Sequence, residues 1–462
     1  MTTEKKAPKF NPIGDIIAGT IMAATSVPQL VAYAQTVGYA SYRGLSTAGP
    51  CLIVWALATG SPFMSCGVTS ITALMAKADL DGESYVAEFG EEKYVHLVAA
   101  YSLWVGLCSA ILGVIGFGKV AALTPSNLRK GFKWGCAVGV VASAVPNGLF
   151  NQGSSELKSH VANSFASGFV TWVKANAPAA TGAVSVTNLL YGISQPFLWG
   201  IFPAILFVLG TAFVMKAPAH LPKSLPPGTE VIIATAVATI LSIYTDYPGN
   251  VIGEIPDADP NAGVKIGPIN VPISMLSFKD LLHAPVVSRF GGSYTTLIIS
   301  ATLFAAVNFI SIMGIASVFE IENGIKWSPP RELLAQGFAC GAAGIVGSAP
   351  VSGSLSRSLV SRMVGTTSCL SAIVTALLWI YLMPFMSIMS STPQAALSAV
   401  IMSAVVKGVV FPKDLLGMKG SDAIIGWGTG IATAVTSPTL GFGLGLIIYT
   451  VVSVLKPKAK LD

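Results

Sequence analysis

The chain has 462 residues, of which 53% are hydrophobic and only 10% are charged. Soluble domains carry roughly a quarter charged residues, so this composition excludes an ordinary soluble protein and indicates a chain that spans a membrane many times. The net charge of +6 requires no nucleic-acid partner, because inner loops of membrane proteins carry excess Lys and Arg. The six cysteines lie in or beside apolar segments without a CxxC spacing, so we expect neither disulfides nor metal ligands, and no cofactor.

Apolar windows recur along the whole chain, and about fourteen of them can be separated. They are 13–34, 46–60, 64–76, 95–117, 131–150, 190–215, 229–245, 294–318, 332–347, 355–366, 369–390, 394–410, 422–437 and 439–455. Only helices and closed barrels span a bilayer, and windows of this length favour helices. The sequence therefore predicts an all-α polytopic membrane protein.

Two windows, 64–76 and 355–366, are too short to cross about 30 Å of hydrocarbon. Each follows a Gly/Pro/Ser-rich interruption, TGSPFMSCG before the first and GSAPVSGS before the second. Each is also the third window of its half of the chain. Matching short segments are typical of transporters built as inverted repeats, with the binding site at the breaks. We therefore expect two repeats of about seven segments, 13–245 and 293–456, with helices three and ten as half-helices.

Charge fixes the predicted orientation. Lysines precede the first window and end the chain, at Lys5, Lys6, Lys9, Lys456, Lys458 and Lys460. Counted from a cytoplasmic amino terminus, the acidic loop 77–94 falls outside, as do the hydrophilic stretches 151–188 and 246–292, and the last of these connects the halves. The positive-inside rule therefore predicts that the terminal segments 1–12 and 457–462 are cytoplasmic. We expect the plasma membrane as the location.

The second break, PVSGSLSRSLVSR, places a permanent cation in the expected membrane interior. A half-helix that begins in mid-membrane directs unpaired N–H groups and the positive end of its dipole at the space before it. Arg357 would add a full charge there, and the hydroxyls of Ser354 and Ser356 could replace the water that an anion loses. The alternative is that Arg357 reaches a membrane surface, as we expect for Arg362.

The first window contains TSVPQLVAYA. Pro28 loosens the helix, and Gln29 and Tyr33, four residues apart, share one face. This pattern indicates polar groups directed at a site. A glutamine in a membrane helix can also serve only to hold two helices together.

Together these stretches resemble the SulP family of anion transporters, the sulfate permease group that includes prestin. The resemblance is carried by DIIAGTIMAATSVPQLVAYAQTVGY, TGSPFMSCGVTSITALM, TPSNLRKGFKWGCAVGV, RELLAQGFACGAAGIVGSAPVSGSLSRSLVSRMVGTTSCLSAIVTAL and TPQAALSAVIMSAVV. Pro62 departs from the family pattern, since many members have Arg there. The resemblance implies a core and a gate domain, a homodimer, and transport of an anion by elevator-type alternating access.

The resemblance also implies which residues bind the anion. They are Gln29 and Tyr33 in helix one, Val68 and Thr69 at the start of helix three, and Ser354, Leu355, Ser356 and Arg357 at the start of helix ten. Many coupled members carry a carboxylate in helix eight, but here Asn308 or Ser311 occupies the equivalent turn. That departure puts cation coupling in question. The family's STAS domain is missing after GFGLGLI, which indicates a short member or a truncated sequence.

The same residues bear on other possible functions. A nucleobase transporter shares the architecture but would place carboxylates in helices eight and ten, where this chain offers a cation. An uncoupled anion channel or a prestin-like voltage-driven motor stays open, because gating leaves no clear sequence pattern. An enzyme is not expected, since the P-loop-like spacing at 113–120 lacks the Mg²⁺-binding Ser/Thr. The anion itself stays open among sulfate or a related oxyanion, bicarbonate and chloride.

Overall fold

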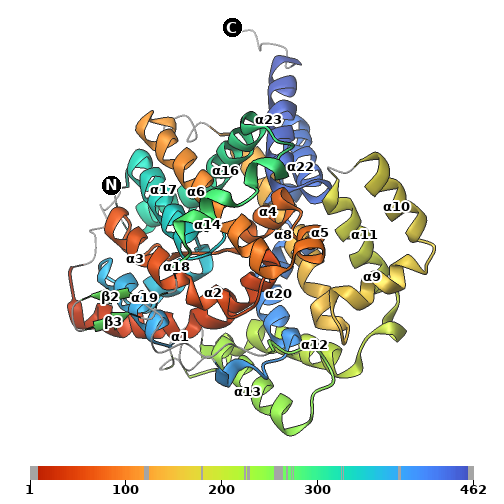
Figure 1. Ribbon diagram of the computed structural model, residues 1–462, viewed down its shortest axis with the longest axis horizontal. Coiled ribbons are helices and arrows are strands. Elements are labelled where there is room, and N and C mark those ends of the chain that lie inside the picture. The colour runs from red at the N-terminus through yellow and green to blue at the C-terminus, as the bar shows by residue number, and fades with distance from the viewer. Residues whose placement is uncertain are drawn as a thin grey trace.

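The computed structural model describes the chain in these ranges: 9–118, 124–177, 180–222, 225, 229–253, 264–266, 269–271, 273, 275–323, 325, 327–382 and 387–455. The basic residues Lys5, Lys6, Lys456, Lys458 and Lys460, the tail 457–462 and the part of the connection at 254–263 lie outside the described residues. The described part is almost entirely helical, and its helices pack in two groups (Figure 1).

The first helix group is built around the two breaks. It comprises α1 (Pro12–Val37), α2 (Arg43–Ser46), α3 (Ala48–Ala58), α4 (Ser70–Leu80), α5 (Gly82–Phe89), α6 (Glu91–Val114), α16 (Tyr294–Asn323), α17 (Pro329–Ile345), α18 (Leu355–Met363) and α19 (Leu370–Leu382). Within it α6 and α17 pack extensively and closely, and a Cβ on Gly106 would lie 2.8 Å from the Gly337 carbonyl oxygen. Small residues let membrane helices approach this closely.

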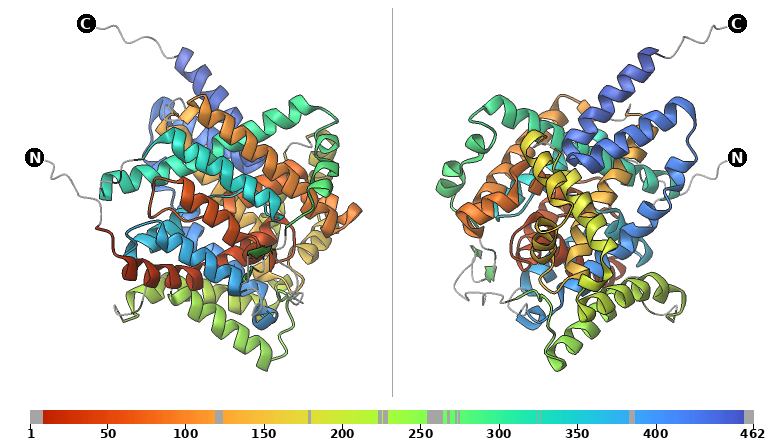
Figure 2. Two further views of the ribbon diagram at one scale, coloured as in Figure 1. Left: turned by 60° about the vertical axis from the view of Figure 1, so that its left-hand side comes forward. Right: turned by 90° about the vertical axis from the view of Figure 1, so that its right-hand side faces the viewer.

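The second helix group lies beside the first, and Figure 1 shows its α9, α10 and α11 at the right, α12 and α13 at the bottom, and α22 and α23 toward the top. It comprises α8 (Ser126–Leu149), α9 (Ser154–Ala162), α10 (Ser167–Asn176), α11 (Thr181–Ser194), α12 (Ile201–Lys216), α13 (Thr229–Tyr244), α20 (Gln394–Val410), α22 (Gly420–Val435) and α23 (Pro438–Leu455). Here α8 and α22 pack backbone to backbone, and a Cβ on Gly131 would lie 2.0 Å from the Gly426 carbonyl oxygen. Figure 2 shows α23 projecting from the rest of the molecule.

Further short elements lie outside the two breaks. They are η1 (Pro196–Leu198), η2 (Ala217–Ala219), β2 (Val264–Ile266), β3 (Ile269–Val271), α14 (Phe278–His283), α15 (Val286–Arg289) and α21 (Lys413–Leu416). Strands β2 and β3 pair antiparallel, with Lys265 opposite Asn270.

Local sequence explains where the first helix begins and ends. Asn11 caps α1 by accepting a hydrogen bond from the Gly14 N–H at 3.1 Å, and Pro12 follows at the first helical position. Gly38 ends the helix with φ of 105°, a conformation that glycine adopts without strain. Pro28 lies inside α1 without ending it, so the helix runs unbroken from Pro12 to Val37.

Two buried carboxylates hold helix ends within the first helix group. Asp15 accepts the Thr367 N–H at 2.6 Å and so joins α1 to the segment before α19. Glu332 accepts the Thr59 hydroxyl at 2.7 Å and the Gly60 N–H at 2.8 Å, which joins α17 to the end of α3. Both carboxylates are fully buried, and their oxygens accept hydrogen bonds from neighbouring segments of the same chain.

The prediction of an all-α membrane protein is confirmed, but the window 190–215 was wrong as one segment. It contains the end of α11 and all but the last residue of α12, separated by η1 at Pro196. Proline lacks the N–H that helix continuation needs, while the apolar residues on both sides keep the hydropathy high. The hydrophilic stretch 151–188 also differs from a simple loop, because it folds into α9, α10 and the start of α11.

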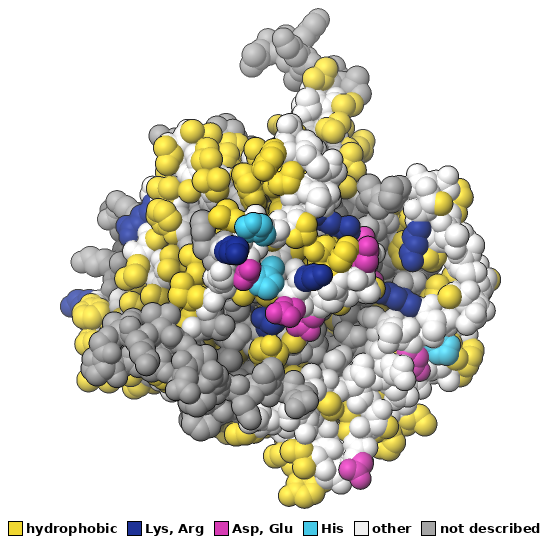
Figure 3. Space-filling view, in the orientation of Figure 1, with side chains coloured by type: hydrophobic (Ala, Val, Ile, Leu, Met, Phe, Trp, Pro, Cys, Tyr) yellow, Lys and Arg dark blue, Asp and Glu magenta, His cyan; other side chains and the backbone are white. Residues whose placement is uncertain are grey.

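The surface of the described part fits a membrane environment. Five helical stretches are long and apolar enough to cross a bilayer: Pro12–Val37, Glu91–Val114, Ile201–Ala219, Tyr294–Met313 and Gln394–Leu416. On the face seen in Figure 3, charged and histidine side chains gather near the centre, over α5 and α14, and hydrophobic side chains cover much of the rim. The protein is therefore an integral, multi-pass membrane protein.

Candidate functional site

The two breaks meet in space as a pair of short strands. Strand β1 (Cys66–Gly67) pairs antiparallel with β4 (Ser352–Gly353), so that Cys66 lies opposite Gly353. The pairing continues where the Ser354 N–H donates to the Ser65 carbonyl at 2.9 Å. Each strand leads directly into a short helix, β1 into α4 and β4 into α18. The structure thus brings together two breaks that lie almost 300 residues apart in the sequence.

The start of α4 is closed by its own side chains. Thr69 is the N-cap, and its hydroxyl accepts the Thr72 N–H at 3.2 Å while the Thr72 hydroxyl accepts the Thr69 N–H at 3.0 Å. This reciprocal pair is a capping box. The start of α18 follows Ser354, which is buried. The side chains of Leu355 and Ser356, both predicted site residues, lie outside the described part of the structure.

Arg357 lies in the first turn of α18 and is only 2% exposed. Both of its terminal nitrogens donate to the Val68 carbonyl oxygen at 3.3 Å, so the cation of one break holds the backbone of the other. Within the described residues Arg357 forms no ion pair with a carboxylate, and its Nε has no hydrogen-bond partner. A surface-reaching arginine is thereby excluded, and a desolvated cation without a protein counter-charge favours an anion beside it.

The two polar residues of α1 face this arginine from the side. Gln29 lines the same cavity as Arg357, and its Oε1 is buried without a partner in the described structure. Tyr33 is 6% exposed, and its hydroxyl interacts with the Ser70 side chain at the start of α4. Pro28 precedes both residues within the unbroken helix.

A cavity of about 290 Å³ opens beside Arg357, between the two helix groups. From the first group it is lined by Thr25, Ser26, Gln29, Arg357 and Val360, and from the second by Val214, Met215, Glu230, Val231, Val400, Ser403, Ala404 and Lys407. Of the predicted site residues whose side chains are described, Gln29 and Arg357 line this cavity. Tyr33, Val68, Thr69 and Ser354 lie around the strand pair behind it.

Asn308, one of the two residues predicted at the helix-eight position, is hydrogen-bonded to the second break. Asn308 is 1% exposed, and its Nδ2 donates to the Val351 carbonyl at 2.8 Å, directly before β4. Asn308 therefore supports the backbone of the second break, while its Oδ1 has no partner among the described residues. Ser311 is half-buried on the same helix. Neither residue lines the cavity beside Arg357.

The second helix group contributes charges that the sequence analysis did not assign to the site. Glu230 is in the first turn of α13, and Lys407 is in the last turn of α20. In the sequence they occur at the ends of apolar windows, where charged residues normally face water. Only their position around one cavity with Arg357 connects them.

Fold and site together define the class: a multi-pass helical membrane protein with a desolvated arginine where two interrupted helices meet. The Sulfate permease family model matches residues 13–429, and the chain belongs to this family. A probable sulfate transporter of Mycobacterium tuberculosis is 27% identical, covering 96% of this chain and 70% of that protein. Human solute carrier family 26 member 6 is 23% identical, covering 96% of this chain and 54% of its own length.

Two solved structures share the fold. The murine Slc26a9 anion transporter in its inward-facing state superimposes with a TM-score of 0.72 at 18% identity, covering 96% of this chain and 68% of that one. The transmembrane domain of the cyanobacterium bicarbonate transporter BicA gives a TM-score of 0.68 at 17% identity, covering 96% of this chain and 99% of that domain. The predicted membership of a family of anion transporters is confirmed.

Proposed function

We propose that this protein moves a small inorganic anion across the bilayer by secondary active transport, with sulfate or a related oxyanion, bicarbonate and chloride as the candidates. The observation that carries the proposal is Arg357, a desolvated cation that forms no ion pair with the described carboxylates and lines a cavity between two helix groups. The names of the relatives support it, since they include sulfate, bicarbonate and anion transporters. No enzymatic role is proposed.

The proposed anion site is the space bounded by Arg357, Gln29 and the starts of α4 and α18. Arg357 would supply the charge, Gln29 and Tyr33 would contact the anion from α1, and Val68 and Thr69 with Ser354, Leu355 and Ser356 would form the two helix starts. The positive ends of the α4 and α18 dipoles add to the attraction. This assignment depends on Arg357 being held in place by the Val68 carbonyl.

Alternating access would come from movement of the first helix group against the second. The cavity lies on the boundary between them, so a displacement along that boundary would carry the strand pair and its anion from one side to the other. The two inverted repeats, 13–245 and 293–456, would allow two arrangements of the helix groups, one open to each side of the membrane. Both termini would be cytoplasmic, the membrane would be the plasma membrane, and a homodimer would be the assembly.

Coupling to sodium or protons through helix eight is not part of this proposal. Asn308 carries no charge, and its amide is already bonded to the Val351 carbonyl. Exchange for a second anion, or passive flux, would then dominate. A strict dependence on a sodium gradient that is lost in Ser311→Ala would contradict this part of the proposal.

Flux in proteoliposomes tests the function. We expect Arg357→Gln to reduce uptake of labelled sulfate, chloride and bicarbonate at least about a hundredfold, because removing a desolvated cation from an anion site costs several kcal/mol. Arg289→Gln is the matched control, since that arginine pairs with Asp81 away from the cavity. Normal flux in a well-folded Arg357→Gln protein would remove the site assignment. Uptake that needs no counter-anion inside the vesicle would favour a channel.

A further inference from the structure

The cavity beside Arg357 has a charged wall on the side of the second helix group. Among the described residues that line it, three are charged: Arg357 from α18, Glu230 from α13 and Lys407 from α20. Arg357 belongs to the group that holds the strand pair, whereas Glu230 and Lys407 belong to the opposite group. An anion that reaches Arg357 through this cavity must therefore pass two charges of opposite sign.

Both of these charged residues lie at helix ends. Glu230 is in the first turn of α13, where the positive end of the helix dipole stabilises a carboxylate. Lys407 is in the last turn of α20, where the negative end stabilises an ammonium group. Each residue could for this reason be only a favourable helix-end charge. What distinguishes them is that both line the same cavity as Arg357, so that their charges act on an anion that enters it.

We infer that Glu230 and Lys407 set which anion valence the cavity prefers, with Glu230 disfavouring divalent anions and Lys407 favouring them. The inference rests on the proposed transport of anions and adds a determinant of specificity to it. Coulomb energy scales with the charge of the ion, so a dianion such as sulfate feels each of the two residues twice as strongly as chloride does. Changes at the two residues must therefore move the sulfate-to-chloride ratio in opposite directions.

The test is the ratio of sulfate to chloride uptake in proteoliposomes. Glu230→Gln should raise the ratio about three- to tenfold, and Lys407→Gln should lower it by a similar factor. The double variant should return close to the wild-type ratio. Asp422→Asn is the control, because Asp422 also lies in the first turn of a helix but does not line the cavity, and its ratio should not change.

Chemical modification of the folded protein separates an effect of charge from an effect of misfolding. Lys407→Cys can be modified after folding with a cationic or an anionic thiol reagent, since Lys407 is exposed whereas the native cysteines are buried apart from half-buried Cys369. The cationic adduct should restore the ratio and the anionic adduct should lower it further, with reagent-treated wild-type protein as the reference. Equal ratios in all variants and adducts, or shifts of Glu230→Gln and Lys407→Gln in the same direction, would overturn the inference. A wild-type protein that carries none of the anions would instead overturn the proposed function.

Discussion

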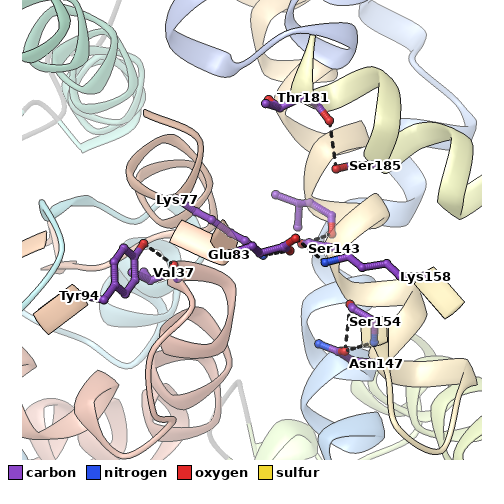
Figure 4. Close-up of polar contacts among 11 residues, drawn as sticks. Val37, Lys77, Glu83, Tyr94, Ser143, Asn147, Ser154, Lys158, Thr181 and Ser185 are labelled. Atoms are coloured by element: carbon purple, nitrogen blue, oxygen red, sulfur yellow. Dashed lines mark hydrogen bonds and ion pairs between the residues drawn. The ribbon is translucent and has the colours of Figure 1, made fainter. Parts of the chain in front are cut away.

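The boundary between the two helix groups is different at its two ends. Helix α8 runs along this boundary. Near the beginning of α8, the Trp134 indole N–H donates to the Val409 carbonyl at 3.3 Å, close to the end of α20. The other end of α8 leads into α9. At the α20 end lies the cavity with Arg357, Glu230 and Lys407. At the α9 end the groups are joined instead by ion pairs (Figure 4).

Those ion pairs are centred on Glu83 of α5. Its carboxylate pairs with Lys77 of α4 at 2.7 Å, within the first helix group, and with Lys158 of α9, across the boundary. Burial opposes ionisation of Glu83, but the ammonium groups of Lys77 and Lys158 outweigh it and lower the pKa of this carboxyl to about 2. We call these three residues the Glu83 bridge. It closes one end of the boundary while the other end is hollow.

The difference between the two ends shows how the boundary can be held closed by contacts that are weak enough to break and form again. The side chains of Glu83 and Lys158 are 49% and 46% exposed, and exposed ion pairs contribute only about 0.2–1 kcal/mol each. A contact of that strength can break in every cycle. The Arg357 end is different, because its cation is desolvated and fixed to backbone, so changes there should have larger effects than changes at the bridge.

Among changes that leave Arg357 itself in place, the largest effect on anion affinity is expected from Gly67→Ala. A Cβ on Gly67 would lie 3.0 Å from Nη2 of Arg357, so the guanidinium group must move away from the Val68 carbonyl. We expect anion affinity, measured from the concentration dependence of uptake, to fall about tenfold, or about 1.4 kcal/mol. Gly341→Ala is the control, because nothing lies within 4 Å of its added Cβ. Equal affinities in the two variants would show that the position of Arg357 matters less than we propose.

A smaller effect is expected from Glu83→Gln, which removes both ion pairs of the bridge. Populations with the α9 end open should rise about three- to tenfold, corresponding to one or two exposed pairs. Spin labels at the exposed positions Glu88 and Ser159 would report this as a longer distance between α5 and α9. Lys174→Gln, a change in α10 outside the bridge, should leave the distances unchanged.

The pH dependence of the same distance follows from the lowered pKa of Glu83. A depressed carboxyl pKa stabilises the folded, bridged state above the unfolded value of 4.5, and this stabilisation is lost as the pH falls toward 2. The distance between labels should therefore be the same at pH 8 and pH 6 and should lengthen below about pH 4. A transition near pH 6 would assign the bridge to another group.

Thr69→Val is expected to have the smallest effect on transport and to act on stability instead. The Thr69 hydroxyl caps α4, so its loss should lower the free energy of unfolding by about 0.5–2 kcal/mol, measured from thermal unfolding in detergent. Thr69→Ser keeps the hydroxyl and should retain the stability. If Thr69→Val instead keeps its stability and loses affinity for every anion, the hydroxyl serves the anion and not the helix cap.

Much of this molecule could be predicted from the sequence because its helices coincide with apolar windows. The window 394–410 has the same bounds as α20, and the short window at 355–366 marked the start of α18 and the position of Arg357. Burial of Arg357 followed from a cation in an interrupted helix. The window 190–215 failed because hydropathy averages over Pro196 and cannot detect a break between two apolar helices.

The charged wall could not be predicted in the same way. Glu230 and Lys407 are 177 positions apart, and locally each is a normal charge at a helix end. The capping role of Thr69 had a local signal, a second threonine three residues later, but the sequence cannot show whether its hydroxyl faces a helix end or a ligand. Both assignments depend on tertiary packing.

Movement of the first helix group against the second requires the Glu83 bridge to open during transport, and cross-linking measures this directly. Cysteines replacing Glu83 and Lys158 would be joined by a reducible bifunctional thiol reagent of about the reach of a lysine–glutamate pair, with each single cysteine variant as control. We expect the joined protein to lose anion uptake and to recover it fully on reduction. Uptake by the joined protein at the rate of the unjoined one would contradict movement of the first helix group against the second.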